Sequence, residues 1–402
     1  MELKLQDIEL AAQRLRPVLH HTELDMSSTF SEMTGGRIYL KCENRQKTGS
    51  FKIRGATNKI AALVERGELK SVVASSAGNH AQGVALAAKS FGIPATIVMP
   101  ATAPIAKIQA TEGYGAKVVL SGDCYDDAYA KAREICEEEG ATFLHPYNDL
   151  DVIAGQGTLG LEILSDLPTA DIVIAPAGGG GLLSGVAACI KQINPRIQII
   201  GVQAEGADAI ARSFREKRYI STDAVSTIAD GIAVKAPGDI TVELINRNVD
   251  DVVTVGDIEI SEAILMLMER CKQIVEPSGA TPVAAVLKGK VDVRGKKVVC
   301  LLSGGNIDVS FIQCIIEQGL VSRHRRLKFT VTLLDKPGSL SGLLNDVAAL
   351  GANILSVEHD RLSAGLNPNE TNVHIACEVG GEAHGENVVA ELKNKGYNLD
   401  II

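Results

Sequence analysis

The sequence lacks the features that mark several classes of protein. Its formal net charge is −9 and it contains no basic block, which argues against nucleic acid as a partner because neutralising phosphates requires clustered lysine and arginine. No apolar run approaches the roughly 18 residues that a membrane span needs. Residues 1–16 alternate charged and apolar side chains at helical spacing, without the apolar segment of a signal peptide. We therefore expect a cytoplasmic protein without a membrane partner.

The cysteines also lack any functional pattern. All eight are scattered, none forms a CxxC pair, and no histidine lies at metal-binding spacing from them. Several lie in apolar runs, for example Cys189 and Cys300. We interpret them as reduced thiols of the core and expect no metal site. Low-complexity segments and solenoid-type repeats are absent as well.

What the sequence does contain is an α/β pattern. An apolar content of 46% and 39 glycines fit a protein built on tight βα turns. Residues 1–35 are interpreted as helices joined by a turn. From residue 37 to about residue 320, short apolar strands alternate with helices. This alternation predicts doubly wound parallel sheets, with ligands beyond the carboxyl ends of the strands.

The composition changes after residue 320. Residues 321–326 are polar and basic and are interpreted as a linker, and the strands that follow alternate strictly between polar and apolar residues. Their order with the intervening helices is βαββαβ, that of a ferredoxin-like module with an antiparallel sheet. The expected elements are strands at 327–334, 353–362, 371–379 and 397–402, a helix at 339–350 capped by Ser339, and a helix at 382–395.

Lys52 lies at the start of a predicted helix, after a turn in which Ser50 is available as the N-cap. A cation is unfavourable there because the N-terminus of a helix is already positive. Lys52 is either an ordinary solvated lysine, or an amine whose pKa is lowered by burial and by this field so that it attacks a carbonyl. The other motifs decide between these two interpretations.

Four consecutive glycines, Gly178 to Gly181, separate a buried strand from a helix that begins at Leu182. An ordinary turn needs only one or two glycines. Without side chains, several N–H groups can converge on an anion in front of the helix dipole. The run is neither a GxGxxG fingerprint nor a Walker loop, which leaves the phosphate monoester of a cofactor or substrate.

Two further turns follow predicted strands, at residues 75–80 and residues 303–306. The first offers small residues and N–H donors for a carboxylate, together with the neutral amide of Asn79. The second offers the hydroxyl of Ser303 where a flat ring has room. Taken alone, each is equally well explained as an ordinary βα turn.

Together, the four segments resemble the fold type II family of pyridoxal-phosphate enzymes, and within it the threonine/serine dehydratases (threonine ammonia-lyases). The resemblance covers about residues 15–320 and also includes IAGQGT at 153–158 and IADG at 228–231. It implies a catalytic domain over residues 1–320, with a small subdomain of about residues 45–150 inserted in a larger one. The module at 327–402 resembles an ACT regulatory domain.

The resemblance implies a role for each matched residue. Lys52 is expected to form a Schiff base with the cofactor aldehyde and then to remove the α-proton of the substrate. Asn79 is expected to bind the ring hydroxyl. Ser303 would face the ring nitrogen, where a neutral group favours loss of a β-hydroxyl over transamination. The expected cofactor-binding residues are Phe51, Lys52, Asn79, Gly178, Gly179, Gly180, Gly181, Leu182 and Ser303. The expected substrate-binding residues are Ser76, Ala77, Gly78, Asn79 and His80.

The implied reaction is the deamination of L-threonine, and of L-serine, by elimination of water, which yields 2-oxobutanoate or pyruvate and ammonia. A serine racemase or a β-replacement synthase on the same scaffold is an alternative. Ala77 stands where racemases carry a serine, and so favours elimination. An amino-acid sensor without catalysis is the alternative from another class, and the intact Lys52 argues against it.

The ACT resemblance implies a branched-chain amino acid as effector and a homo-oligomer, with a tetramer favoured over a dimer. A purely structural dimerisation module is the alternative. Both isoleucine biosynthesis and a degradative role stay open. The divalent-cation site of relatives is not expected, because Gln203, Ala207 and Ala209 lack its carboxylates, whereas a monovalent cation near Glu205 is compatible with the sequence. The expected effector-binding residues are Asp335, Pro337, Gly338, Ser339 and Asn353.

Overall fold

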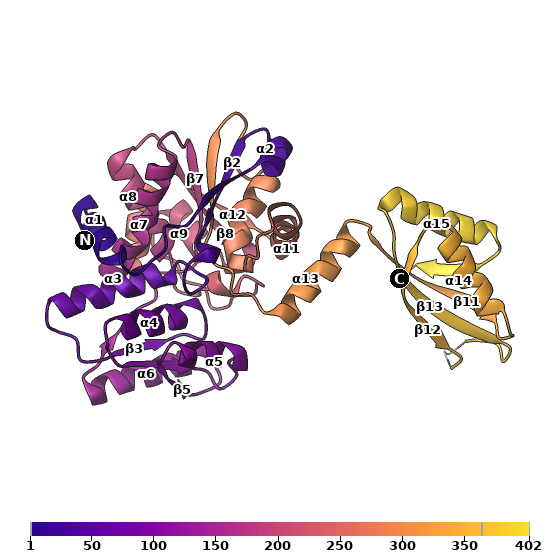
Figure 1. Cartoon of the computed structure of the whole chain (residues 1–402), viewed down its shortest axis with the longest axis horizontal. Coiled ribbons are helices and arrows are strands. Elements are labelled where there is room, and N and C mark those ends of the chain that lie inside the picture. Colours follow the sequence, from indigo (N-terminus) through magenta and orange to yellow (C-terminus); the bar gives the residue numbers. More distant parts are fainter. Residues whose placement is uncertain (1, 363–364, 402) are drawn as a thin grey trace. The chain divides into compact units, whose positions relative to one another are not determined.

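The structure is a computed structural model that describes residues 2–362 and 365–401. It contains two compact units, Met1–Asp308 and Val309–Ile402 (Figure 1). The first unit holds two sheets and the second holds one. The predicted α/β class with doubly wound parallel sheets is confirmed, and so is the ferredoxin-like module.

The larger sheet of the first unit has the strand order β1-β2-β10-β7-β8-β9. Five strands of this sheet, β2, β10, β7, β8 and β9, run parallel to one another. The edge strand β1 pairs with β2 in the antiparallel direction. Figure 1 shows α7 and α8 on one side of these strands and α12 on the other. Because both faces are covered, the central strands are apolar throughout rather than alternating. The strands are β1 (Leu24–Ser27), β2 (Arg37–Cys42), β7 (Ile172–Pro176), β8 (Gln198–Ala204), β9 (Asp251–Val255) and β10 (Lys297–Leu302).

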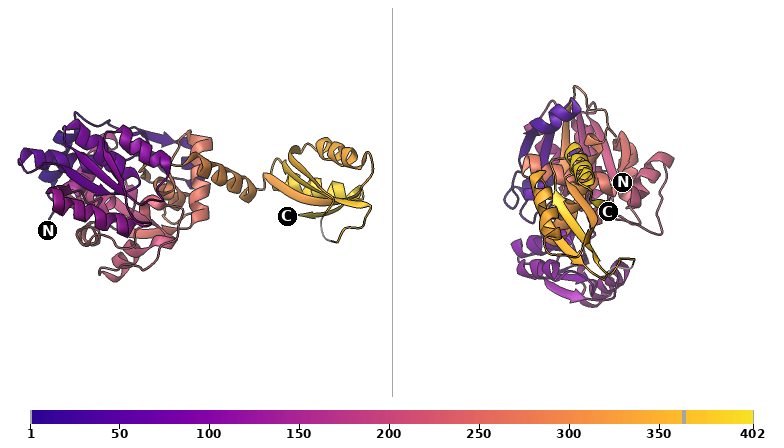
Figure 2. Two further views of the ribbon diagram at one scale, coloured as in Figure 1. Left: turned by 90° about the horizontal axis from the view of Figure 1, so that it is seen from below. Right: turned by 90° about the vertical axis from the view of Figure 1, so that its right-hand side faces the viewer.

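In the described part of the chain, eight helices of the first unit pack around this larger sheet and against one another (Figure 2). They are α1 (Leu5–Leu15), α2 (Ser28–Thr34), α7 (Leu150–Asp166), α8 (Gly181–Ile193), α9 (Ala209–Glu216), α10 (Asp239–Asn248), α11 (Asp257–Met266) and α12 (Pro277–Leu287). Among the described residues, none of the helices is long and apolar enough to cross a membrane.

The smaller sheet has the order β5-β4-β3-β6, and all its strand pairs are parallel. Its residues lie between β2 and β7 in the sequence. The strands are β3 (Val72–Ser75), β4 (Ala95–Met99), β5 (Lys117–Leu120) and β6 (Thr142–Phe143). The associated helices are α3 (Lys52–Glu65), α4 (Asn79–Ser90), α5 (Ile105–Gly113) and α6 (Tyr125–Glu139).

The second unit begins with α13 (Val309–Ser322) and contains an antiparallel sheet of order β12-β13-β11-β14. Alternate residues of β11, such as Phe329, Val331 and Leu333, are buried against α14 and α15. This one-sided burial explains the strict alternation in the sequence. The elements are β11 (Arg326–Leu334), α14 (Ser339–Ala349), β12 (Asn353–Asp360), β13 (Glu370–Glu378), α15 (Glu382–Asn394) and β14 (Asn398–Ile401).

Several boundaries differ from the predicted ones. Residues 24–27 form an edge strand where helices were expected, and β9, α9, α10 and α12 were not anticipated. Helix α12 is buried on nearly all sides, so its sequence shows no amphipathic period. Residues 321 and 322 belong to α13 and residue 326 to β11, which leaves residues 323–325 as the connection. Residue 402, at the end of the last predicted strand, lies outside the described residues.

Two predicted caps are wrong. The N-cap position of α3 is occupied by Phe51, and no side-chain hydrogen bond caps this helix. The hydroxyl of Ser50, the predicted cap, has no hydrogen-bond partner in the described structure. Ser339 is the first residue of α14, and Gly338, with a φ of 92°, takes the cap position. All eight cysteines are free, but Cys124 and Cys314 are exposed rather than in the core.

Candidate active site

The predicted site residues follow the carboxyl ends of parallel strands from both sheets of the first unit. Gly178 follows β7, Ser303 follows β10 and Ser76 follows β3. Lys52 opens α3 after the segment that leaves β2. In α/β folds this edge of the sheet is where ligands bind, because helix N-termini and turn amides meet there.

The amine of Lys52 is held at the start of α3. Its Nζ donates a hydrogen bond of 3.1 Å to the carbonyl oxygen of Pro146. Burial lowers the pKa of Lys52 to about 8, and the nearby Glu276 carboxylate only partly opposes this shift. About a tenth of the amine is therefore neutral and nucleophilic at pH 7, far more than for a lysine with an unshifted pKa.

The glycine run has no space for side chains. A Cβ on Gly179 would lie 2.3 to 2.5 Å from ring atoms of Tyr147, and one on Gly181 would lie 2.9 Å from the Cβ of Tyr147. Gly180 has a φ of 95°, and a Cβ there would meet the hydroxyl of Thr241 at 2.7 Å. The same hydroxyl donates to the carbonyl oxygen of Gly179 at 2.7 Å. Packing against Tyr147 and Thr241 thus fixes the backbone of the run.

The run also opens helix α8 without a cap from a side chain. Gly180 is the N-cap residue, and no side-chain hydrogen bond caps this end. The first N–H groups of a helix have no acceptor within the helix, and they carry the positive end of its dipole. The backbone here is therefore a ready anion site of the kind that holds a phosphate.

One short segment connects the lysine to the glycine run. Pro146 accepts the hydrogen bond from Lys52, and the next residue, Tyr147, packs its ring on Gly179 and its Cβ and backbone on Gly181. His145 precedes them, and its Nδ1 accepts from the N–H of Asn148 at 2.9 Å. Burial, together with the charge of Lys52, lowers the pKa of His145 to about 4, so its ring is neutral.

Asn79 lies in a network of polar side chains. Its Nδ2 donates to both carboxylate oxygens of Glu276, at 2.9 Å each, and its Oδ1 accepts from Nδ2 of Asn306 at 2.7 Å. Asn306 also donates to the carbonyl oxygen of Thr48 at 2.7 Å. The turns after β3 and β10 and the segment before Lys52 are thereby brought together.

Ser303 is joined to the lysine segment through the backbone. Its carbonyl oxygen accepts from the N–H of Phe51 at 3.0 Å, and Ser50 forms an antiparallel bridge with Gly304. Gly305 donates in turn to Gly49 at 2.9 Å. Ser303, only 2% exposed, is therefore held beside the start of α3.

The turn after β3 is open where the glycine run is closed. A Cβ on Gly78 would have no atom within 4 Å. The N–H of Gly78 donates to Oγ of Ser76 at 3.1 Å, and Ala77 beside it is partly exposed. His80 points away into the core, where its Nε2 bonds to the carbonyl of Leu144 at 3.0 Å, so only its backbone is left for a ligand. Burial lowers the pKa of His80 to about 3.

Comparisons with known proteins agree with this arrangement. The family model described as "Pyridoxal-phosphate dependent enzyme" matches residues 15–304. The chain belongs to the pyridoxal-phosphate dependent enzymes. The L-threonine ammonia-lyase of Thermotoga maritima is 51% identical over 400 residues, and the match covers 100% of both chains. An L-threonine dehydratase, catabolic TdcB, of Staphylococcus aureus is 49% identical over 322 residues, which cover 79% of this chain and 93% of that protein.

Solved structures give the same grouping. The processed form of threonine deaminase isoform 2 from Solanum lycopersicum is 37% identical with a TM-score of 0.76, and the match covers 79% of this chain and 87% of the other. Maize serine racemase is 39% identical with a TM-score of 0.75, and the match covers 81% of this chain and 100% of the other. The predicted family and enzyme class are confirmed.

The residues present in this pyridoxal-phosphate dependent enzyme fit the cofactor. The uncapped glycine run suits its phosphate, and the buried amine of Lys52 suits its aldehyde. In addition, the hydroxyls of Ser50, Ser75 and Ser278 are buried and have no hydrogen-bond partner in the described structure. Unpaired buried hydroxyls are costly, and a polar ligand is one way in which they are satisfied.

Sequence reasoning missed some residues of this site. Glu276 is 4% exposed and contacts Asn79, and Tyr147 and Thr241 support the glycine run. The one local signal that could have suggested Glu276 is an acidic residue between the apolar Val275 and a helix-opening proline.

One matched motif has a packing role. Gly155 of IAGQGT lies against Gly55, since a Cβ on it would meet the Cα of Gly55 at 2.7 Å. Thr158 accepts from the buried guanidinium of Arg54 at 3.2 Å. The motif therefore brings α7 close to α3, and so fixes the helix that Lys52 opens.

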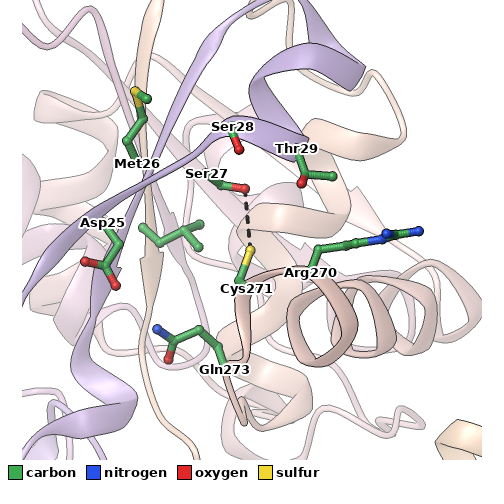
Figure 3. Close-up of a pocket in the computed structure, with 9 residues that line it drawn as sticks. Asp25, Met26, Ser27, Ser28, Thr29, Arg270, Cys271 and Gln273 are labelled. Carbon is green, nitrogen blue, oxygen red and sulfur yellow. Dashed lines mark hydrogen bonds between the residues drawn. The ribbon is translucent and has the colours of Figure 1, made fainter.

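A separate cavity of about 310 Å³ lies at the start of α2 and shares no residue with the predicted site (Figure 3). Ser27 bonds to Cys271 across it at 3.4 Å. Its lining has neither a lysine nor a glycine run and does not fit the cofactor. The lining residues are Asp25, Met26, Ser27, Ser28, Thr29, Leu40, Arg270, Cys271 and Gln273. Elsewhere in the described residues, no group of His, Cys, Asp and Glu gathers as a metal site.

Proposed function

We propose that this protein is an L-threonine ammonia-lyase that also accepts L-serine. The proposal is carried by one observation, namely that the amine of Lys52 and the glycine run contact adjacent residues, Pro146 and Tyr147. An amine beside an anion site is what pyridoxal phosphate requires. The net reaction converts L-threonine into 2-oxobutanoate and ammonia, with water lost and then regained.

The residues proposed to hold the cofactor are those that the family resemblance implies, and the uncapped glycine run and the buried amine of Lys52 support them. The N–H groups of Gly178 to Gly181 and of Leu182 would bind the phosphate, Asn79 would bind the ring hydroxyl, and Ser303 would face the ring nitrogen, with Phe51 alongside. When bound, pyridoxal phosphate supplies an electron sink for the pair left at the α-carbon of the substrate. A neutral serine beside the ring nitrogen keeps this sink modest, which favours rapid loss of the β-hydroxyl.

The remaining residues would act on the amino acid. The hydroxyl of Ser76 and the N–H groups of Gly78, Asn79 and His80 would bind the carboxylate at the open turn, with Ala77 between them, because the N–H of Ser76 already donates to the carbonyl oxygen of Val98. Nζ of Lys52 takes the α-proton, a role supported by its pKa of about 8. The low pKa values of His80, about 3, and of His145, about 4, make both rings weak bases, which leaves Lys52 as the proton acceptor there.

The test is a 2-oxo acid assay on L-threonine and L-serine, with and without each branched-chain amino acid. A yellow protein with absorption near ~410 nm that borohydride bleaches, and that releases 2-oxobutanoate, is the expected result. A colourless, inert protein would instead favour an amino-acid sensor.

A serine racemase is the second candidate, because maize serine racemase is 39% identical over 81% of this chain. Racemisation needs a proton donor on the face of the substrate opposite Lys52. Ala77 has no hydroxyl to supply that proton, so chiral chromatography should detect pyruvate and no D-serine. D-serine formed faster than pyruvate would reverse this ranking, and activity only with an added thiol would indicate a synthase.

The C-terminal residues 327–402 are proposed to be an ACT module that regulates the catalytic residues 1–320. Within one chain the proposed effector residues fall at two ends of the sheet. Leu334, before the loop of Asp335, Pro337, Gly338 and Ser339, pairs with Glu370, whereas Asn353 pairs with Glu378. These positions are about 26 Å apart along β13, at about 3.3 Å per residue. A site that uses both ends therefore needs two copies of the chain, which supports a homo-oligomer, with a tetramer proposed.

The cellular setting is proposed on the same basis. Eight free cysteines suit the reducing cytoplasm. Isoleucine or valine is the proposed effector, and isoleucine biosynthesis the proposed role, since 2-oxobutanoate is a branched-chain precursor by its carbon skeleton. A monovalent cation near Glu205 is also part of the proposal and is tested by activity in potassium against tetramethylammonium buffers.

A further inference from the structure

Glu276 is a buried acid next to the proposed cofactor site that no step above uses. It is 4% exposed and lies just before α12, and its N–H donates to the carbonyl oxygen of Gly304 at 3.0 Å. A Cβ on Gly304 would come within 2.4 Å of its Oε1. The glycine at position 304 thus makes room for this carboxylate directly beside Ser303.

The contacts of Glu276 determine which way the Asn79 amide points. Both carboxylate oxygens lie 2.9 Å from Nδ2 of Asn79, and Asn306 donates to its Oδ1. A carboxylate only accepts hydrogen bonds, and Nδ2 of Asn306 only donates. The amide of Asn79 is therefore fixed in orientation, with Nδ2, which carries two hydrogens, as the atom that can donate to a ligand.

We infer that Glu276 is a positioning residue for the cofactor ring, which acts by holding Asn79 as a hydrogen-bond donor. The inference rests on the proposed role of Asn79 at the ring hydroxyl. An oxygen that meets a fixed donor is favoured in its ionised form, so the pair of Glu276 and Asn79 selects the charge state of the ring as well as its place.

Burial makes the charge of Glu276 change near neutral pH. Burial raises its pKa to about 7, Asp230 adds to this shift, and Asn79, Lys107 and Lys52 oppose it. Lys107 also forms an ion pair of 3.2 Å with Asp230. Above pH 7 the carboxylate is ionised and accepts from Asn79 with both oxygens. Below pH 7 one oxygen carries a proton and the hold on the amide weakens.

The experiment measures cofactor affinity by titrating the apoenzyme with pyridoxal phosphate, for wild type, Glu276→Gln, Asn79→Ala and the double variant. Glu262→Gln is the control, since it removes a carboxylate that pairs with Lys288 away from this site. We expect Glu276→Gln to weaken binding about tenfold or more, as for loss of a hydrogen bond to a charged group. In the Asn79→Ala background, the same substitution should add less than about twofold, because its effect passes through Asn79.

Two further readouts separate positioning from a structural role. The affinity of the wild type should fall more steeply between pH 8 and pH 6 than that of Glu276→Gln. Glu276→Asp should restore part of the affinity, and it also serves if Glu276→Gln does not fold. The inference would be overturned if Glu276→Gln lowered cofactor affinity equally in the wild-type and Asn79→Ala backgrounds. It would also be overturned if Glu276→Gln kept both the cofactor affinity and the absorption maximum of the wild type. A wild type that binds the cofactor but does not deaminate threonine would refute the proposed function alone.

Discussion

The turn after β7 and the turn after β3 are built alike but packed in opposite ways. Each follows a parallel strand and opens a helix that has no side-chain cap. Atoms of Tyr147 would lie within 2.5 Å of a Cβ on Gly179, whereas a Cβ on Gly78 would meet nothing within 4 Å. The first turn is tightly packed, and the second is open.

This difference matches the two ligands proposed for the turns. A phosphate that stays bound through many turnovers benefits from a backbone whose N–H groups are fixed beforehand. A substrate carboxylate has to enter and leave, and it needs room at the turn that receives it. Lys52 opens α3, and in the proposed function it is the side chain that acts on both ligands.

The largest expected effect comes from removing that shared residue. Lys52→Ala should lower 2-oxobutanoate formation by more than about 10³-fold, because both the anchor of the cofactor and the base are lost. The measurement is turnover together with absorption near ~410 nm. Lys47→Ala, which removes an exposed lysine five residues earlier, is the matched control and should keep both. Full turnover by Lys52→Ala would end the assignment.

Alanine in each turn tests the comparison itself. Gly179→Ala must displace the ring of Tyr147, so it should cost about 1 to 3 kcal/mol of unfolding free energy and weaken cofactor binding at least about tenfold. Gly78→Ala should change stability by no more than about 0.5 kcal/mol and keep the cofactor, but raise KM for threonine. Urea unfolding, cofactor titration and steady-state kinetics measure these effects. If both variants lose the cofactor equally, the distinction between the turns is wrong.

A smaller effect is expected from pH. Burial lowers the pKa of His80 from 6.5 to about 3, so below pH 6.5 the unfolded chain takes up a proton that the folded chain does not. The stability that His80 gives is thus complete above pH 6.5 and is lost as pH falls. Between pH 6.5 and pH 5, the free energy of unfolding of His80→Gln should therefore fall by about 2 kcal/mol less than that of the wild type. Urea unfolding at the two values measures it, and equal slopes for both proteins would contradict it.

The smallest effect on turnover is expected from the second unit. Deleting residues 327–402 removes no residue of the two turns, so basal deamination should stay within about twofold of the full chain. Any response to isoleucine or valine should disappear, since coupling needs an effector that prefers one state of the enzyme. An unchanged effector response in the truncated chain would place the regulatory site elsewhere.

The sequence was sufficient for features that depend on local patterns. Parallel strands, the glycine run, the position of Lys52 and the alternating strands of the second unit all follow from local periodicity and turn residues. It was not sufficient for features set by tertiary contacts. Helix α12 is buried all round and shows no period, and the four-residue strand β1 exists because β2 offers it an edge.

Within the site the same limit applies. The four motifs were visible because each combines strand, turn and helix in one stretch. Glu276 could not be recognised in the same way, because its partner Asn79 is 197 residues away and no local pattern joins the two residues. The cap at Ser50 failed for a related reason, since pairing of the segment with Gly304 took its backbone away from the cap position.

The point at which the cofactor is attached can be found directly. The holoenzyme is reduced with borohydride and digested, and the peptide that carries the pyridoxyl phosphate group is identified by mass spectrometry. We expect the modification on Nζ of Lys52, with Gly179→Ala reducing its yield and Gly78→Ala leaving it unchanged. Modification of another lysine, or none in a protein that still deaminates threonine, would contradict the role given to Lys52.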